Sequence, residues 1–305
     1  MSSFLASISI YICICVCLSL QNEVVANFMI PNCGVSYESH VATRIVRGKE
    51  ALLKSAPFMA YLYNGSQLHC GGTIISNRYI LTAAHCMRPY LKVRLGEHDI
   101  TRNPDCQAGV SCSPSVEEFY IDLATKSKNF GRHLVNDIAL LKLSRIIRFN
   151  GLYGLIITVR LDSDMKIESS CFSVHIQPIC LLLNPAAAPN VQEFQAFGWG
   201  QTENNRSANV LQTTFLTRYD NNYCRSALHV PMTDNQLCVG FQGSDTCSGD
   251  SGGPLVTKVK YDGVWRSVQL GIVSFGENKC QSPGVYTYVP NYIRWIQSVM
   301  QANGY

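Results

Sequence analysis

Short apolar runs separated by clusters of Gly, Pro, Asn and Asp are the dominant pattern along this chain. Runs of this length, rich in Val, Ile, Leu and Tyr, are typical of β-strands. We expect strands at 72–76, 79–82, 93–95, 138–143, 264–273 and 284–289. Between two apolar runs, Asp262-Gly263 predicts a two-residue hairpin, because both turn positions favour a positive φ. The pattern therefore predicts an all-β barrel or sandwich.

One segment near the C-terminus has helical periodicity instead. Its apolar side chains recur three and four residues apart, at Tyr292, Ile293, Trp295, Ile296, Val299 and Met300. We expect a terminal helix that packs this face on the body of the protein. The aromatic stripe is interpreted as core and not as a ligand site.

Composition narrows the class of protein. Charged residues make up 15% of the 305 residues, hydrophobic residues 47%, and the formal net charge is +4. A chain this poor in charge is not disordered, and it lacks the clusters of Lys and Arg that nucleic-acid binding needs. Its length is sufficient for one large domain or two small ones with a sizeable core.

The N-terminal segment resembles a secretory signal peptide. An apolar stretch at 4–20 is followed by polar residues and then by Val24-Val25-Ala26, so we expect cleavage after Ala26 and a secreted, extracellular product. No Lys or Arg precedes the apolar stretch. An uncleaved membrane anchor is therefore the alternative, although the stretch barely reaches the ~20 residues of a membrane span.

Cysteine usage agrees with secretion. Of the 14 cysteines, Cys13, Cys15 and Cys17 lie in the predicted signal peptide, which leaves an odd number in the mature chain. Without a CxxC pair or a His-x-His array, this density predicts disulfides and not a metal site. The sequons at Asn64 and Asn205 predict glycosylation.

Three polar residues point to nucleophilic catalysis. Ser251 lies between Gly249-Asp250 and Gly252-Gly253, where a tight turn would expose its hydroxyl and aim backbone N–H groups at a reacting carbonyl. His85 ends an apolar run, and Asp137 precedes another. Taken singly, His85 could be a core histidine and Asp137 a cap at the end of a strand.

Together, Ala83-Ala84-His85-Cys86, Asp137-Ile138-Ala139-Leu140 and Gly249-Asp250-Ser251-Gly252-Gly253 resemble the trypsin-like serine proteases, in the order His, Asp, Ser. The resemblance covers Ile45 to the C-terminus. It implies the chymotrypsin fold, two six-stranded antiparallel β-barrels with a C-terminal helix. It also implies that Ser251 is the nucleophile, that His85 is the general base, and that Asp137 orients the imidazole. The N–H groups of Gly249 and Ser251 would form the oxyanion hole.

The resemblance also implies cleavage after Arg or Lys. Asp245 occupies the floor of the family's specificity pocket, where a carboxylate pairs with a guanidinium or an ammonium. Thr246 adds a hydroxyl near the floor, and Gly276 and Gly284 keep the pocket walls open. The substrate backbone would pair with Ser274, Phe275 and Gly276.

A zymogen is implied by Arg44-Ile45-Val46. Cleavage after Arg44, by an upstream trypsin-like protease or by self-activation, would free the Ile45 amino group to pair with Asp250. Residues 27–44 would form a short propeptide, tethered by Cys33 to the peptidase domain at 45–305. This propeptide is too short to contain the clip module of the clip-type cascade proteases that the chain resembles.

The family pattern pairs ten of the cysteines: Cys33 with Cys180, Cys70 with Cys86, Cys106 with Cys112, Cys224 with Cys238, and Cys247 with Cys280. Cys171 is left over, inside an atypical insertion at 151–173. Two interpretations of the insertion stay open. One is a real surface loop that offers an apolar patch or strand to a partner. The preferred one is translated non-coding sequence retained in the gene model, because its removal leaves an even number of cysteines.

No cofactor is required by this chemistry. Glu97, Glu117 and Glu118 flank a loop that holds calcium in some relatives, so calcium is a possible ligand there. The expected partners are a protein substrate, an upstream activating protease and a serpin-type inhibitor, and we expect a monomer with no membrane attachment after signal removal. The alternative function is a non-catalytic protease homologue that acts as a binding cofactor.

Overall fold

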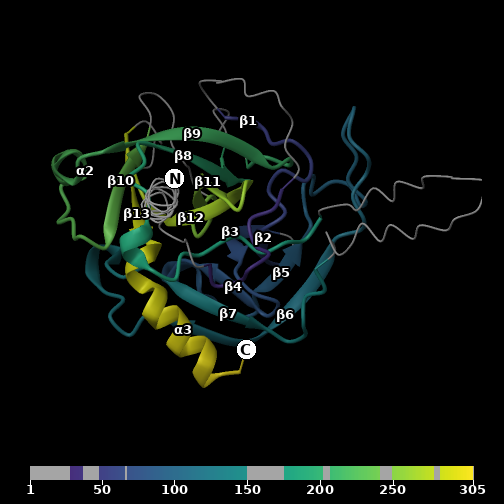
Figure 1. Cartoon of the computed structure of the whole chain (residues 1–305), viewed down its shortest axis with the longest axis horizontal. Helices are drawn as coiled ribbons and strands as arrows, with labels where there is room; N and C mark the ends of the chain where they lie inside the picture. The colour runs from purple at the N-terminus through teal and green to yellow at the C-terminus, as the bar shows by residue number, and fades with distance from the viewer. Residues whose placement is uncertain are drawn as a thin grey trace, which may run out of the picture.

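The structure is a computed structural model, and it describes residues 28–36, 48–65, 67–149, 175–201, 207–240, 249–277 and 282–304. Two β-barrels lie side by side in it (Figure 1). The first barrel closes in the order β2-β3-β4-β7-β6-β5, with every pair antiparallel. Its strands are β2 (Met59–Asn64), β3 (Gln67–Ile74), β4 (Tyr79–Thr82), β5 (Lys92–Leu95), β6 (Glu117–Lys126) and β7 (Ala139–Leu143).

The second barrel contains six strands and one added strand. The order is β1-β9-β10-β13-β12-β11-β8, and β8 also pairs with β9, so β8 to β13 close on themselves and β1 lies on the outer edge of β9. These strands are β1 (Lys49–Glu50), β8 (Glu193–Gly198), β9 (Gln212–Tyr219), β10 (Gln236–Gly240), β11 (Pro254–Tyr261), β12 (Val264–Phe275) and β13 (Gly284–Tyr288). The predicted fold class is confirmed.

Each predicted strand overlaps a strand of the structure, and the predicted hairpin is confirmed. Tyr261 pairs with Val264 across the turn, where Asp262 has φ 48° and Gly263 has φ 77°. The predicted strand ranges did not include β1, β2, β6, β8, β9 or β10, and of β11 only the end at the hairpin was predicted. Strand β6 is mostly exposed and half of its residues are polar, so its apolar pattern is weaker than that of the buried strands.

Two α-helices lie in the described ranges, with four short 3₁₀ helices. The expected terminal helix is α3 (Ile293–Ala302), which buries Ile293, Ile296 and Met300 in the core shared with the first barrel. Helix α2 (Asn221–Leu228), a polar helix capped by the Asp220 side chain, was not predicted from the sequence. The 3₁₀ helices are η1 (Ala84–Cys86), η2 (Arg132–Leu134), η3 (Pro185–Ala187) and η4 (Val289–Tyr292).

The C-terminal segment connects the barrels. It leaves β13 of the second barrel and crosses to the first, where α3 lies beside β7 (Figure 1). The Tyr79 hydroxyl donates to the Gly304 carbonyl at 2.9 Å, and the Lys142 ammonium donates to the Asn303 carbonyl. This crossing fixes one barrel against the other, which matters because residues from both meet at the candidate site. None of the helices in the described ranges is long and apolar enough to span a bilayer.

Candidate active site

His85 follows the fully buried strand β4 and lies in the short helix η1. Its neighbours Ala84 and Cys86 are buried in the first barrel, and its own side chain keeps a 24% exposed fraction. The buried strand before His85 therefore places a partly exposed imidazole at the end of the barrel.

Asp137 lies in a tight turn that leads into β7. The preceding Asn136 has φ 57°, and the Ile138 N–H donates to the Asn136 carbonyl at 2.9 Å. The Asp137 side chain has no exposed surface. A buried carboxylate has to be paired or hydrogen-bonded, so its partners determine what it does.

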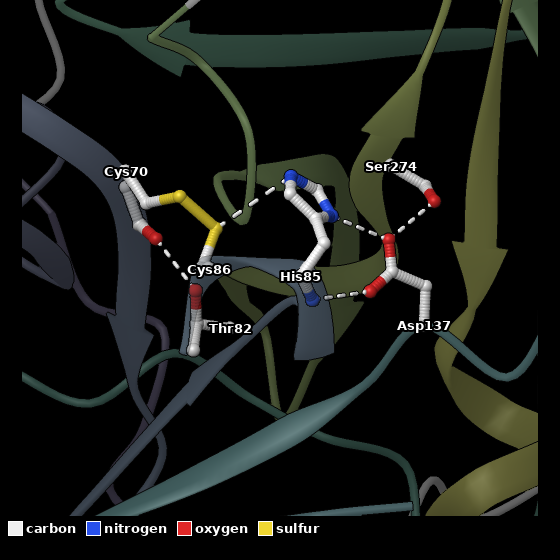
Figure 2. The surroundings of a disulfide bond; sticks show 7 residues. Cys70, Thr82, His85, Cys86, Asp137 and Ser274 are labelled. Carbon is white, nitrogen blue, oxygen red and sulfur yellow. Dashed lines mark hydrogen bonds and ion pairs between the residues drawn. A yellow bond between two sulfur atoms is a disulfide. The ribbon is translucent and has the colours of Figure 1, made fainter. Parts of the chain in front are cut away.

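The two side chains contact each other directly (Figure 2). The Nδ1 atom of His85 lies 2.7 Å from Oδ2 of Asp137, and the backbone N–H of His85 donates to Oδ1 at 2.9 Å. The Ser274 hydroxyl donates to Oδ2 at 2.6 Å from the second barrel. Because Asp137 accepts at Nδ1, the imidazole is fixed in the tautomer whose Nε2 atom is free to accept a proton.

Ser251 is held between the two barrels in a turn before β11. Its carbonyl accepts the Gly71 N–H at 2.8 Å from β3, and the next N–H, of Gly252, donates to the Val273 carbonyl at 2.9 Å in β12. Gly252 has φ 78°, and a β-carbon on it would lie 3.1 Å from the Cys86 sulfur. The turn of Ser251 therefore packs against the disulfide that adjoins His85.

Asp250 faces the strand end at Gly198 to Gly200. Its Oδ1 atom accepts the Gly200 N–H at 2.8 Å, and a β-carbon on Gly198 would lie 1.9 Å from that oxygen. Glycine at 198 and 200 is thus required for the close approach of this carboxylate. Gly249 has φ 101°, and the Gly253 N–H donates to the Asp250 carbonyl, so the turn that contains Ser251 has a defined backbone path.

The predicted pocket walls lie at the ends of two paired strands. Phe275 of β12 is opposite Val285 of β13, which places the following Gly276 and the preceding Gly284 at the same edge. The register shifts between Val273 and Phe275, and this bulge turns the Ser274 side chain towards Asp137.

Several predicted site residues lie outside the described ranges. They are Arg44 and Ile45 of the activation site, Asp245 and Thr246 of the pocket floor, the pair Cys247 and Cys280, the sequon at Asn205, and the insertion at 151–173 with Cys171. For the other predicted sequon, the structure describes the asparagine, Asn64. Asn64 is exposed at the end of β2, and its side-chain amide donates to the Pro89 carbonyl at 3.2 Å.

Four of the predicted disulfides are present: Cys33–Cys180, Cys70–Cys86, Cys106–Cys112 and Cys224–Cys238. In the described part of the chain, the one group of three metal-type ligands within 4.8 Å of one another is Cys70, His85 and Cys86. Because the two sulfur atoms of this group are bonded to each other, they are not available as thiolates for a metal. The disulfide is instead the wall beside His85.

The three carboxylates of the calcium prediction face arginines. Glu97 and Glu118 each accept from the Arg94 guanidinium, at 2.9 and 2.8 Å, and Glu117 accepts from Arg145 at 3.0 Å. Calcium binding would have to displace these ion pairs. A calcium site here stays a prediction.

Two residues that support Asp137 were not among the predicted site residues. The Thr287 hydroxyl donates to the Asp137 carbonyl at 2.8 Å, and the Tyr292 hydroxyl donates to the Asn136 side chain at 2.8 Å. Burial, with the charge of Asp137, raises the pKa of Tyr292 to about 12, so this hydroxyl stays a donor. The available signal was that a buried tyrosine needs a partner for its hydroxyl.

Comparison with known proteins gives the family. The Trypsin family model matches residues 45–296. The chain is 33% identical to Serine protease grass of Drosophila melanogaster, over 92% of this chain and 78% of the relative, and 31% identical to Melanization protease 1 of the same species, over 90% and 69%. It is similar to the crystal structure of the Drosophila Grass clip serine protease of the Toll pathway, with a TM-score of 0.72, 34% identity, and coverage of 93% of this chain and 77% of that one. The chain therefore belongs to the trypsin family and is a trypsin-like serine endopeptidase.

Proposed function

We propose that this endopeptidase is a secreted zymogen that, once cut after Arg44, hydrolyses peptide bonds after Arg or Lys through Ser251, His85 and Asp137. The observation that carries the proposal is the 2.7 Å contact between His85 and the fully buried Asp137, beside the clamped turn of Ser251. A histidine held by a carboxylate next to a serine in a glycine turn is the arrangement that activates a hydroxyl.

The first half of the reaction forms an acyl-enzyme. The Ser251 hydroxyl oxygen attacks the carbonyl carbon while Nε2 of His85 takes the hydroxyl proton. The negative charge moves to the carbonyl oxygen, which the N–H groups of Gly249 and Ser251 stabilise. When the C–N bond breaks, His85 returns the proton to the leaving amine.

The second half releases the product acid. Water attacks the acyl carbon, His85 takes its proton, and the bond to the Ser251 oxygen breaks as His85 returns the proton to Ser251. Throughout, Asp137 accepts from Nδ1 of His85 and stabilises the imidazolium. Ser274 helps to hold Asp137 in place with its hydroxyl at 2.6 Å.

Specificity for Arg or Lys rests on Asp245 and Thr246 at the pocket floor, with Gly276 and Gly284 as small walls. A buried carboxylate at the end of an open pocket favours a cationic side chain. Ser274 and Phe275 end β12 and Gly276 follows it, and these three residues would offer their backbone to the substrate as a neighbouring strand.

An extracellular proteolytic cascade is the proposed setting. One relative is described as a protease of the Toll pathway and another is named Melanization protease 1, which supports this setting. Secretion is supported by the disulfides and the signal-like N-terminus. We propose that the enzyme is a monomer that needs no cofactor, and that an upstream protease and a serpin-type inhibitor control it.

The test is hydrolysis by the secreted full-length chain before and after cleavage at Arg44. Reporter peptides ending in Arg, Lys or Phe are compared, with Ser251→Ala as the matched inactive control. The proposal requires turnover of the Arg and Lys reporters in the cut wild type alone. Turnover by cut Ser251→Ala, or equal turnover of the Phe reporter, would contradict it.

The alternative is a non-catalytic homologue that acts as a binding cofactor. A reagent that labels active-site serines separates the two functions. Covalent labelling of Ser251 in the cut wild type supports the enzyme. A folded, correctly cut protein that neither labels nor turns over any reporter supports the cofactor.

A further inference from the structure

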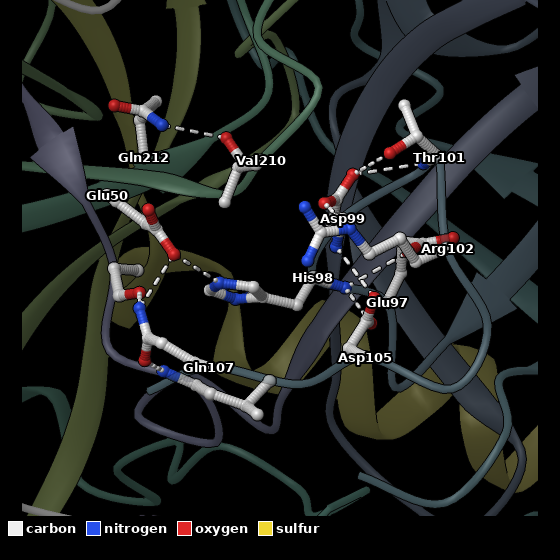
Figure 3. Close-up of polar contacts among 12 residues, drawn as sticks. Glu50, Glu97, His98, Asp99, Thr101, Arg102, Asp105, Gln107, Val210 and Gln212 are labelled. Carbon is white, nitrogen blue, oxygen red and sulfur yellow. Dashed lines mark hydrogen bonds and ion pairs between the residues drawn. The ribbon is translucent and has the colours of Figure 1, made fainter. Parts of the chain in front are cut away.

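The loop between β5 and β6 contacts the segment that follows the proposed activation site (Figure 3). Gln107 makes the central contact. Its Oε1 atom accepts the Leu53 N–H at 2.7 Å, and its Nε2 atom donates to Oε1 of Glu50 at 2.6 Å. From the same loop, the Ser111 hydroxyl accepts from the Lys54 ammonium at 2.9 Å. Residues 50–54 are therefore held by one loop at three points.

The part of the loop that precedes Gln107 is held in place by a disulfide and by hydrogen bonds. The preceding Cys106 is bonded to Cys112. The Asp105 carboxylate is buried and accepts the N–H groups of His98 at 2.9 Å and Asp99 at 3.2 Å. Because the backbone on the N-terminal side of Gln107 is fixed in this way, little further conformational freedom is lost when its amide binds residues 50–54.

The same loop also contacts the strand end that holds Asp250. The His98 carbonyl accepts the Trp199 indole N–H at 3.1 Å and the Leu211 N–H at 2.8 Å. Trp199 lies between the two glycines against which Asp250 packs. His98 completes the connection, because its Nε2 atom lies 3.3 Å from the Glu50 carboxylate. Together with the pairing of β1 with β9, which also holds Glu50, this loop sets the position of residues 50–54 relative to Asp250.

We propose that Gln107 is a positioning residue for activation: by adding its contacts to the pairing of β1 with β9, it tightens the hold of Asp250 on the amino group freed at Ile45. The proposal rests on the proposed function, since it requires cleavage after Arg44. Glu50 lies five positions after Ile45, a reach of at most about 18 Å. Anchoring the end of so short a segment confines the freed terminus and raises its effective concentration at Asp250.

The test measures how often the freed terminus is exposed. Protein cut at Arg44 is treated with cyanate, and carbamylation of the Ile45 amino group is followed by mass spectrometry of the N-terminal peptide. A terminus bound to Asp250 reacts slowly, in proportion to its unbound fraction. In Gln107→Ala the rate is expected to rise about five- to tenfold, the effect of losing one hydrogen bond of typical net strength. Gln301→Ala, an exposed glutamine near the end of α3, is the matched control and should react like wild type.

A charge exchange separates a direct contact from general destabilisation. Gln107→Glu places a carboxylate against Glu50 and is expected to raise the carbamylation rate at least as much as Gln107→Ala. Combining Gln107→Glu with Glu50→Gln restores a donor–acceptor pair at the same place, so the rate is expected to return towards the wild-type value. Thermal unfolding of each variant verifies that the barrels are intact.

The outcomes separate this proposal from the proposed function. If the cut wild type hydrolyses Arg and Lys reporters and protects its terminus, but Gln107→Ala protects it equally well, the role of Gln107 is refuted and the protease function stands. Failure of the charge exchange to restore protection refutes the direct contact. If the cut wild type neither turns over substrate nor protects its terminus, the activation step itself is refuted, and this proposal with it.

Discussion

Gly252→Ala tests whether the turn of Ser251 is clamped as tightly as the structure indicates. Gly252 has φ 78°, a conformation that costs a residue with a β-carbon roughly 1–2 kcal/mol. The new methyl group would lie 2.2 Å from the Thr82 hydroxyl oxygen and 2.5 Å from the Gly71 carbonyl oxygen. The Thr82 hydroxyl donates a hydrogen bond of 2.8 Å to the Gly71 carbonyl, which the methyl group would disrupt.

The size of the effect follows from the distance. Ordinary contacts of a β-carbon begin near 3.4 Å, so relieving the clash with Thr82 requires a shift of about 1 Å. The Gly71 N–H holds the Ser251 carbonyl, and therefore the shift is transmitted to the nucleophile. A misplacement of about 1 Å in a catalytic group costs on the order of 10²-fold in rate. We expect kcat/KM of Gly252→Ala to fall by roughly that factor.

The assay compares Gly252→Ala with Gly263→Ala. Gly263 has nearly the same backbone angle, φ 77°, but a β-carbon there meets no atom within 4 Å. Both variants are expected to lose roughly 1–2 kcal/mol of stability from the backbone conformation, measured by denaturant unfolding. The loss of kcat/KM, corrected by titration of the active serine, is expected in Gly252→Ala alone.

One result would refute this reasoning. If folded Gly252→Ala keeps kcat/KM within about threefold of Gly263→Ala, the interior of the turn tolerates displacement, and the contacts of Ser251 with the two barrels do not set its catalytic position.

Two further predictions concern buried polar groups. Ser274→Ala removes the 2.6 Å donor to the buried Asp137 carboxylate, so unfolding experiments should show a loss of about 1.5–3 kcal/mol, and a loss below about 0.5 kcal/mol would mean that water replaces the hydroxyl. Burial lowers the pKa of His175 below 6.5. As the pH falls through 6.5, the unfolded chain binds a proton at this histidine while the folded protein does not, so the folded state becomes less stable. Between pH about 7.5 and about 5, the free energy of unfolding of His175→Gln should therefore fall less than that of wild type. An equal fall in both proteins would contradict the lowered pKa of His175.

Much of the fold could be predicted from local pattern. The hairpin at Asp262-Gly263 was predictable because a turn with positive φ at two consecutive positions accepts few residue types, and Asp-Gly is one of the favoured pairs. The terminal helix was predictable because its buried side chains recur at helical spacing. Strand β6 and helix α2 were not, since most of their side chains are exposed and tertiary pairing, not a local apolar face, fixes their conformation.

The candidate site, too, was predictable from the sequence only in part. His85, Asp137 and Ser251 stand out in sequence because each lies in a short, characteristic segment. The support of Asp137 by Ser274 and Thr287 could not be read there, because these hydroxyls come from strands of the other barrel, more than a hundred residues away along the chain.

The elements and the chemical groups follow from the sequence alone: short strands, a hairpin, a terminal helix, paired cysteines, and a serine, a histidine and an aspartate in a family-like order. These depend on local backbone preference and on side-chain chemistry, both of which the sequence states directly. The clamping of the Ser251 turn between two barrels and the contacts of Gln107 with residues 50–54 are visible only in three dimensions. Such contacts depend on distances between segments far apart in the chain, which are fixed by barrel closure and packing.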